Sequence, residues 1–193
     1  MQNIQLSSHF ELREFTESAT ARKHGIVNEP PLEAVENLKA LCEHTLEPLR
    51  EALGLPIIIT SGYRCKVLNE LITHHSTRSQ HRTGEAADFW VKGLADLEAP
   101  AKRGTAIMQG ADNSPAEMAE IAERTGANRR ELLIRAFRTI ILDEHIVFDQ
   151  LIIYPTFIHV SYVRNGKNRS KLTRGFGNGK YCALSRAEAL ALV

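Results

Sequence analysis

Apolar residues recur at helical spacing in two long segments of the chain. The first segment begins at Pro30–Pro31 and ends at Gly54, and the second spans about 129–143. Proline is tolerated in a first turn and glycine favours the conformation after a last turn, so these residues mark the ends of the first helix. The internal Pro48 is expected to bend or split it. A short helix is predicted at about 66–71, and short helices that begin with capping signals are predicted at about 8–15, 114–124 and 185–193.

Four shorter runs have the composition of β-strands. Residues 56–60 are apolar and β-branched, and residues 86–91 are mostly apolar. The runs 148–154 and 157–163 are separated only by Pro155–Thr156, so they are expected to form an antiparallel hairpin. Together these elements predict an α+β fold, with a small antiparallel sheet flanked by helices.

Charge and composition exclude several classes of partner. The 193 residues include 24 basic and 23 acidic side chains, so no general attraction to nucleic acid or to an anionic membrane is expected. The tail, residues 165–193, is basic and predicted to be loop-rich and solvated, with a patch that meets an anionic polymer as the alternative. The three cysteines form no CxxC pair, which argues against a disulfide framework or a thiolate zinc site.

The chain contains no segment with the length and apolar character of a membrane span. Its first thirty residues also hold no apolar stretch of signal-peptide length. We therefore expect no membrane insertion, and a protein that is made and left in the cytoplasm unless something else exports it.

Three polar residues stand out in apolar or turn surroundings: His81, Asp88 and His159. Asp88 and His159 interrupt predicted strands, where a buried polar group is costly unless it meets a cation or a hydrogen-bonding partner. His81 lies in a predicted loop, and Gly84 allows a turn that brings it back to Asp88. Two imidazoles and one carboxylate form the ligand set of hydrolytic zinc sites. From the residues alone, two alternatives remain: a metal site, or three core residues whose polar groups form hydrogen bonds within the protein.

Several separated motifs resemble those of the M15 metallopeptidases, the D-Ala-D-Ala carboxypeptidase and dipeptidase family. Ser79–Asp88 resembles the SxHxxGxAxD motif of this family, and Ser61–Arg64 resembles its SGYR segment. Phe157–Tyr162 is similar to its closing strand, which provides the last ligand. Residues within 8–28 and 37–50 are similar to the N-terminal signature of the phage-type branch.

The resemblance covers about 10–92 and 128–172, with the motifs in the family's order. It implies the fold of the hedgehog and DD-peptidase group, as a single domain over residues 1–193. Where relatives have a short passage between the second strand and the next helix, this chain has an insertion at about 93–126. The insertion is either a surface excursion or a flap over the substrate groove.

The resemblance also implies the roles of individual residues. It implies that His81, Asp88 and His159 hold one zinc ion, that Arg64 binds the substrate carbonyl or the developing oxyanion, and that Ser79 contacts the substrate. The implied activity is hydrolysis of a peptide bond in bacterial peptidoglycan stem peptides, by a carboxypeptidase or endopeptidase of phage or prophage origin. Such an enzyme would act on the cell wall after release.

The sequence departs from the family at one position. Many active members carry Glu or Asp as general base three residues before the last ligand, and here that residue is Thr156, whose hydroxyl cannot accept a proton near neutral pH. Three alternatives stay open. Another carboxylate reaches the metal, zinc alone supports slow hydrolysis, or the domain is an inactive metal-binding module that binds the cell wall or is structural. The candidate carboxylates are Glu85, Asp143, Glu144 and Asp149.

Overall fold

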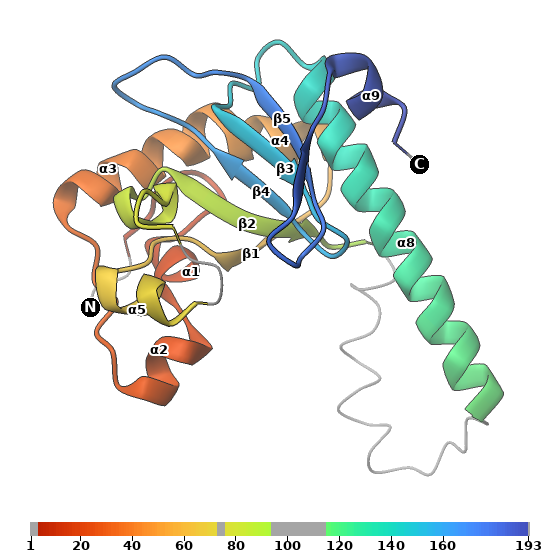
Figure 1. Ribbon diagram of the computed structural model, residues 1–193, viewed down its shortest axis with the longest axis horizontal. Coiled ribbons are helices and arrows are strands. Elements are labelled where there is room, and N and C mark those ends of the chain that lie inside the picture. The colour runs from red at the N-terminus through yellow and green to blue at the C-terminus, as the bar shows by residue number, and fades with distance from the viewer. Residues whose placement is uncertain (1–3, 73–75, 94–114, 193) are drawn as a thin grey trace.

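The computed structural model describes residues 4–72, 76–93 and 115–192, with the backbone alone for residues 115–127. Helices and one six-stranded sheet form an α+β fold, as predicted (Figure 1). The strand order in the sheet is β1-β2-β4-β3-β5-β6. The strands are β1 (Ile57–Ser61), β2 (Ala86–Val91), β3 (Gln150–Ile153), β4 (Ile158–Ser161), β5 (Lys171–Gly175) and β6 (Tyr181–Ala183).

The four strands predicted from the sequence form an antiparallel sheet. β1 pairs with β2, β2 pairs with β4, and β4 pairs with β3, the last pair being the expected hairpin. β5 then pairs with β3 in parallel and carries β6 on its other edge, so the complete sheet is mixed. Neither β5 nor β6 is predicted from the sequence.

The prediction of loop structure in the tail is wrong where β5 and β6 lie. In β5, Leu172 and Thr173 are buried, whereas Lys171 and Arg174 on either side are exposed. Because charged residues flank the two buried residues, the sequence shows no strand pattern here. The segment is a strand because it pairs with β3, which is distant in the sequence. The last helix, in contrast, begins with the predicted capping box of Ser185.

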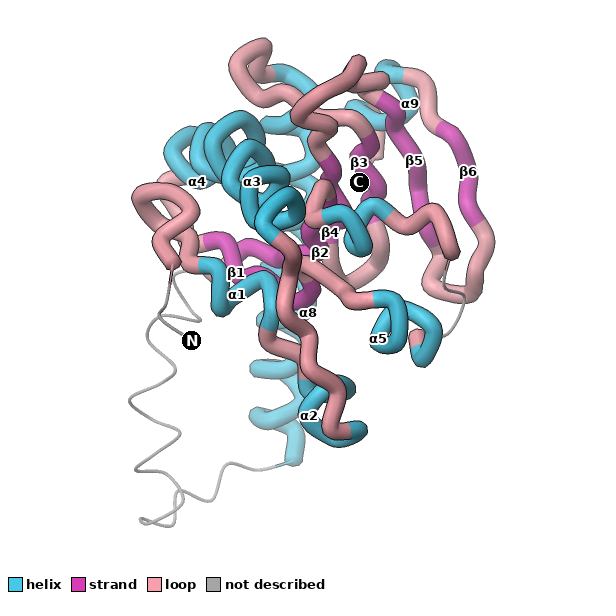
Figure 2. The backbone as a smooth tube through the Cα atoms, turned by 90° about the vertical axis from the view of Figure 1, so that its left-hand side faces the viewer, coloured by secondary structure: helices cyan, strands magenta, loops and turns pink. Residues whose placement is uncertain are grey.

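The helices pack mainly around β1 to β4 (Figure 2). They are α1 (Leu12–Thr16), α2 (Ala19–His24), α3 (Leu32–Leu41), α4 (Glu47–Leu53), α5 (Lys66–Leu71), α8 (Pro115–Leu142) and α9 (Arg186–Leu190), with a π-helix η1 (Cys42–Leu46) and a 3₁₀-helix η2 (Gln80–Thr83). α8 contacts α4, β2 and β3, and so joins the N-terminal helices to the sheet.

The helix predicted to end at Gly54 is present in three consecutive parts, α3, η1 and α4. Gly54 ends it in the left-handed conformation, with φ 63°, as predicted. Pro48 lies in the first turn of α4, where it has no N–H to continue the helical hydrogen bonds. The wider turn of the π-helix η1 before it accommodates this interruption. Within η1, the hydroxyl of Thr45 donates to the carbonyl of Val147 (2.6 Å), which ties the helix to the approach to β3.

Two predicted helix boundaries are wrong. α1 begins after Glu11, whose capping box with Glu14 replaces the one expected at Ser8. α8 is one continuous helix from its predicted first-turn proline, so Gly126 does not end a helix. A glycine inside a helix costs about 1 kcal/mol relative to alanine, which the rest of a long helix can offset. Most of the predicted insertion at 93–126 lies outside the described residues.

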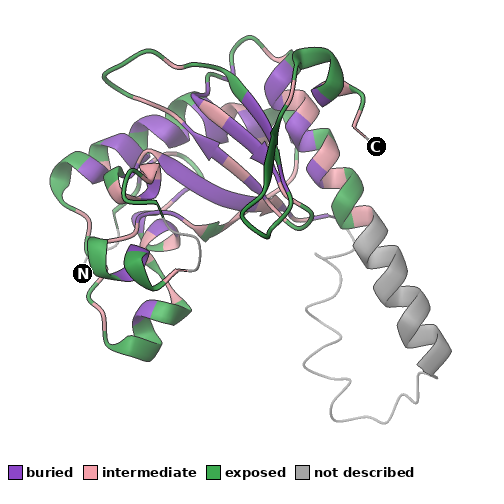
Figure 3. Cartoon of the chain, viewed as in Figure 1, coloured by how far each residue is buried: buried purple, intermediate pink, exposed green. Residues whose placement is uncertain are grey.

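The apolar core lies on one face of the sheet, because strand side chains alternate between the two faces. Phe89 of β2 and Val160 of β4 belong to the core, whereas their neighbours Asp88 and His159 lie on the opposite face. Buried residues follow the sheet and the inner sides of α3 and α4 (Figure 3). Large members of the core from the helices are Leu38, Leu41, Leu49, Phe137 and Ile140.

Candidate metal centre

Two of the three predicted ligands lie side by side on neighbouring strands. Asp88 is the direct register partner of His159 in the ladder between β2 and β4. Both residues alternate with core residues, so both side chains lie on the sheet face away from the core. The distance from His159 Nδ1 to Asp88 Oδ1 is 2.8 Å. The strand register therefore brings together two residues that are 71 positions apart in the sequence.

The third predicted ligand, His81, reaches the same point from η2. The predicted turn is present, because Gly84 ends η2 with φ 73°, and a Cβ on Gly84 would overlap the carbonyl oxygen of Ala34. His81 Nδ1 lies 2.7 Å from the carbonyl oxygen of Gly62, which can only accept, so Nδ1 carries the proton. Nε2 of His81 is therefore left with a free lone pair, and it faces the other two residues.

The three ligand atoms form a compact triangle. His81 Nε2 lies 3.2 Å from His159 Nδ1 and 3.3 Å from Asp88 Oδ1. Ligands of a tetrahedral zinc ion, each about 2.0–2.1 Å from the metal, are about 3.3 Å from one another. Among His, Cys, Asp and Glu residues in the described part of the chain, these three form the group whose ligand atoms lie close enough together to hold one metal ion.

Arg64 lies next to this triangle. Its Nη2 donates to Asp88 Oδ2 (2.9 Å), and its Nε donates to the hydroxyl of Ser61 at the end of β1 (2.9 Å). The ion pair is mostly buried, with the side chains of Arg64 and Asp88 14% and 13% exposed. Asp88 therefore presents Oδ1 to the two imidazoles while the guanidinium holds Oδ2, as outer partners of metal-ligating carboxylates do.

The protonation states of the buried ligands suit a metal ion. Burial by itself would raise the pKa of Asp88, but His81 and His159 outweigh burial and hold that pKa well below its usual range. Burial lowers the pKa of His81, and the attraction of Asp88 opposes the shift only in part. An ionised carboxylate and a neutral imidazole are the forms that bind a metal.

The triangle lines a cleft of about 460 Å³. Arg64 and Ser79 line the same cleft, so the structure brings all five predicted site residues together: Arg64, Ser79, His81, Asp88 and His159. Other parts of the wall come from the hairpin of β3 and β4, from the segment between β5 and β6, and from the start of β6. These parts contribute residues that are not predicted from the sequence, among them Tyr154, Phe157, Gly177 and Tyr181.

Asp88 is the one carboxylate among the described residues that line the cleft. Thr156, at the position where relatives carry a general base, does not line it. The four candidate replacements also lie outside the lining: Glu85, Asp143, Glu144 and Asp149. The alternative in which one of these carboxylates acts at the metal therefore gains no support from their positions.

Asp149 has a different set of partners. It is 1% exposed, and it accepts hydrogen bonds from the guanidinium of Arg169 (2.5 and 2.7 Å) and from the side-chain amide of Gln80 (3.0 Å). Burial would raise the pKa of Asp149, but the hydrogen bonds from Arg169 and Gln80 hold it below its usual value. Asp149 thus anchors the tail to the sheet and fixes Gln80 in the wall of the cleft.

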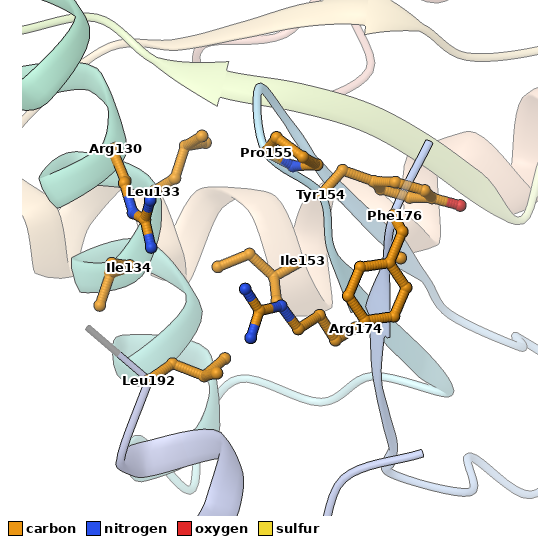
Figure 4. Close-up of a pocket in the computed structure, with 10 residues that line it drawn as sticks. Arg130, Leu133, Ile134, Ile153, Tyr154, Pro155, Arg174, Phe176 and Leu192 are labelled. Carbon is orange, nitrogen blue, oxygen red and sulfur yellow. The ribbon is translucent and has the colours of Figure 1, made fainter. Parts of the chain in front are cut away.

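A second cavity, of about 130 Å³, adjoins the cleft between α8, the hairpin and β5 (Figure 4). Its walls include the apolar side chains of Leu133 and Ile153 and the two arginines Arg130 and Arg174. Tyr154 lines both cavities. The hydroxyl of Tyr154 points away from the second cavity in Figure 4, which places it on the side of the metal cleft.

Tyr154 could have been found from the sequence by its position. The predicted hairpin folds the residues around Pro155–Thr156 next to His159, and Tyr154 is the polar aromatic residue at that turn. An aromatic residue at the end of a strand is common, however, so its type alone gives no functional signal.

Comparison with known proteins gives one family. The sequence model of the family described as Peptidase M15 matches residues 8–112, which is more than half of the chain. The matched region includes Arg64, Ser79, His81 and Asp88, whereas His159 lies beyond its end. No curated protein matches the chain. None of the described helices is long and apolar enough to cross a membrane.

Proposed function

The chain belongs to the peptidase M15 family, and on that premise we propose that it is a zinc-dependent peptidase that hydrolyses a peptide bond in peptidoglycan stem peptides. The observation that carries the proposal is the triangle of His81, Asp88 and His159 in the wall of a cleft. This ligand set is typical of hydrolytic zinc enzymes, which leave the fourth position open.

When bound, a zinc ion supplies Lewis-acid chemistry, because it polarises a carbonyl oxygen and makes a water molecule more acidic. His81, Asp88 and His159 would hold the ion. Arg64 would bind the carbonyl oxygen on which negative charge develops. A guanidinium has five N–H donors, and Ser61 and Asp88 take two of them, so Arg64 has further donors for the substrate. Because its two bonds fix it in advance, it needs little reorganisation during the reaction.

The charge of the cleft supports an anionic peptide as the substrate. Arg64 and Arg78 both line the cleft, and Asp88 is the one carboxylate among its described lining residues. A bound divalent cation would add two positive charges, so the cleft would attract carboxylate groups. Stem peptides of peptidoglycan carry several carboxylates. Ser79 also lines the cleft, and its hydroxyl would form a hydrogen bond with such a peptide.

The place of action follows from the proposed substrate. Because peptidoglycan lies outside the cytoplasmic membrane, the enzyme would act on the bacterial cell wall after its release. A phage or prophage origin fits this route, and it is supported by the similarity of residues 8–28 and 37–50 to the phage-type signature.

Hydrolysis of muropeptides tests the proposal. Protein carrying one equivalent of zinc is incubated with muropeptides that have complete stem peptides, and mass spectrometry identifies any bond that is cut. His159→Ala, which removes a ligand, serves as the control and should give no products. If the folded, zinc-loaded protein cuts no bond in any muropeptide, the proposed activity is contradicted.

As a second candidate function, the protein is a metal-binding module that does not cut peptidoglycan. It either binds the cell wall or has a structural role. Thr156 and the single carboxylate among the described lining residues favour it, since general-base catalysis typically contributes about 10²- to 10⁴-fold to the rate. Under this alternative, the protein co-sediments with purified peptidoglycan. Muropeptides then stay intact with the wild-type protein and with His159→Ala alike.

A further inference from the structure

Tyr154 is a polar residue of the metal cleft to which the proposed mechanism gives no role. It follows directly after β3 and lines the cleft together with Arg64 and the three candidate ligands. Its hydroxyl lies 3.2 Å from the hydroxyl of Tyr181 and points away from the neighbouring cavity (Figure 4). The hydroxyl of Tyr154 is therefore available on the side where a substrate would bind.

Contacts on several sides fix the ring of Tyr154. Phe157 stacks on it, with the ring centroids 4.3 Å apart and the planes inclined by 16°. Gly175 of β5 approaches so closely that a Cβ there would overlap the ring. Tyr181 meets its edge and holds the hydroxyl. A donor that is fixed before the substrate arrives needs little reorganisation when charge develops on its acceptor.

The surroundings also keep the hydroxyl protonated. Burial raises the pKa of the Tyr154 phenol, and Tyr181 and Asp88 raise it further, whereas Arg64 opposes the shift. Near neutral pH, Tyr154 is therefore a hydrogen-bond donor and not a base. This property suits an oxygen atom that becomes negative during a reaction, and it does not suit the task of deprotonating water.

We propose that Tyr154 is a further catalytic residue, whose hydroxyl donates a hydrogen bond to the scissile carbonyl oxygen of the bound peptide. This inference rests on the proposed function. The oxygen of a water molecule forms a bond to the carbonyl carbon, and the π electrons move to the carbonyl oxygen, where Arg64 and Tyr154 stabilise the charge. As that electron pair returns, the C–N bond breaks, and a proton from the water ends on the leaving amine. Tyr154 keeps its own proton throughout.

Tyr181 has a supporting position. It is 55% exposed, and its hydroxyl accepts a hydrogen bond from the hydroxyl of Tyr154 (3.2 Å), which holds Tyr154 in place until a substrate oxygen becomes the acceptor. Tyr181 is thus a positioning residue, and its loss should affect the reaction less than the loss of the Tyr154 hydroxyl.

Tyr154→Phe tests the inference, because it removes the hydroxyl and keeps the ring that stacks on Phe157. The zinc content and thermal unfolding of the variant should match those of the wild type. We expect kcat for muropeptides to fall about 10²-fold or more with little change in KM, as when one oxyanion donor is removed. A phosphinate analogue of D-Ala-D-Ala, whose tetrahedral group resembles the oxyanion, should bind the zinc-loaded variant about 10- to 100-fold more weakly in calorimetry.

The control Tyr181→Phe should weaken phosphinate binding less than Tyr154→Phe does. Equal phosphinate affinity in the wild type and Tyr154→Phe would overturn the inference, whether or not muropeptides are cleaved. If the wild type cleaves nothing and Tyr154→Phe still weakens phosphinate binding, the contact of Tyr154 stands and the proposed peptidase activity fails. If the wild type cleaves muropeptides and Tyr154→Phe leaves kcat and affinity unchanged, the activity stands and the inference fails.

Discussion

Three buried carboxylates, Glu47, Asp88 and Asp149, each meet partners from a distant part of the chain. Glu47 accepts hydrogen bonds from the backbone and the ring of His9, 38 positions away. Asp88 meets Arg64 and the two imidazoles, and Asp149 meets Arg169. A buried charge is stable only when it is compensated in this way. The ionisation of these three groups is therefore linked to the stability of the fold.

Asp149→Asn should lower the free energy of unfolding by about 1–3 kcal/mol near pH 7, because Arg169 loses its charged acceptor. The pKa of Asp149 is lower in the folded protein than the ordinary value of 3.8. Its stabilising contribution is therefore present above pH 3.8 and lost as the pH falls through the lower folded value.

Urea unfolding of the wild type and Asp149→Asn over this range measures the effect. The difference in stability between the two proteins should shrink below pH 3.8. Glu144→Gln, a change at an exposed carboxylate, should behave as the wild type. A difference that stays constant with pH would contradict the account of Asp149.

At the residue scale, the sequence identifies groups that are unusual for their position. Asp88 and His159 are conspicuous because they interrupt apolar strands, and the structure places both in the candidate metal centre. Gln80 and Tyr154 are ordinary for a loop and a strand end, so only their spatial neighbours reveal them. Composition and spacing therefore single out the candidate residues, and the resemblance to the M15 family implies their role as ligands. Neither predicts the wall of the cleft.

At the scale of elements, the turn from η2 to β2 sets the position of His81. Gly84→Ala would place a methyl group against the carbonyl oxygen of Ala34 at a positive φ. We expect a loss of about 2–4 kcal/mol in the free energy of unfolding, together with weaker zinc binding, since the turn must move.

Gly54→Ala is a matched control for this prediction. Gly54 has a similar φ of 63°, and a Cβ on it would meet nothing within 4 Å. Its replacement should cost about 1–2 kcal/mol, the strain of the left-handed conformation alone, and leave zinc binding unchanged. Denaturant unfolding and zinc titration of both variants make the comparison. Equal losses in both properties would show that the contact with Ala34 is unimportant.

The elements predicted from the sequence are those with a local signal. β2 and the hairpin of β3 and β4 have apolar runs that are long enough to recognise, and Gly54 and Ser185 mark helix ends by their own conformations. β5 is a strand because it pairs with β3, and this pairing leaves no apolar pattern in five residues of which two are charged. Non-local pairing is thus the main source of the differences.

At the scale of the whole molecule, a metal ion would join the consecutive elements η2 and β2 to β4, which is distant from them in the sequence. A ligand that binds only the folded protein stabilises it by about 2.7 kcal/mol at a free concentration of 100 Kd. For a chain of this size, this should raise the melting temperature by roughly 5–10 °C.

Calorimetry with zinc and with a chelator measures this shift. The wild-type protein should lose the gain when the metal is removed, and His81→Ala should show no gain at any zinc concentration. A melting temperature of the wild-type protein that zinc does not change would show that the metal does not bind the folded protein.

The most direct test of the central claim is the zinc content of purified protein, measured by elemental analysis after preparation without chelator. The wild type should hold about one equivalent, and His159→Ala, which changes the ligand outside the family match, should hold less than about a tenth. His145→Ala, at a histidine whose side chain is 93% exposed, is the control and should keep the full equivalent. A wild-type protein without zinc, or His159→Ala with a full equivalent, would contradict the assignment of His81, Asp88 and His159 as the metal centre.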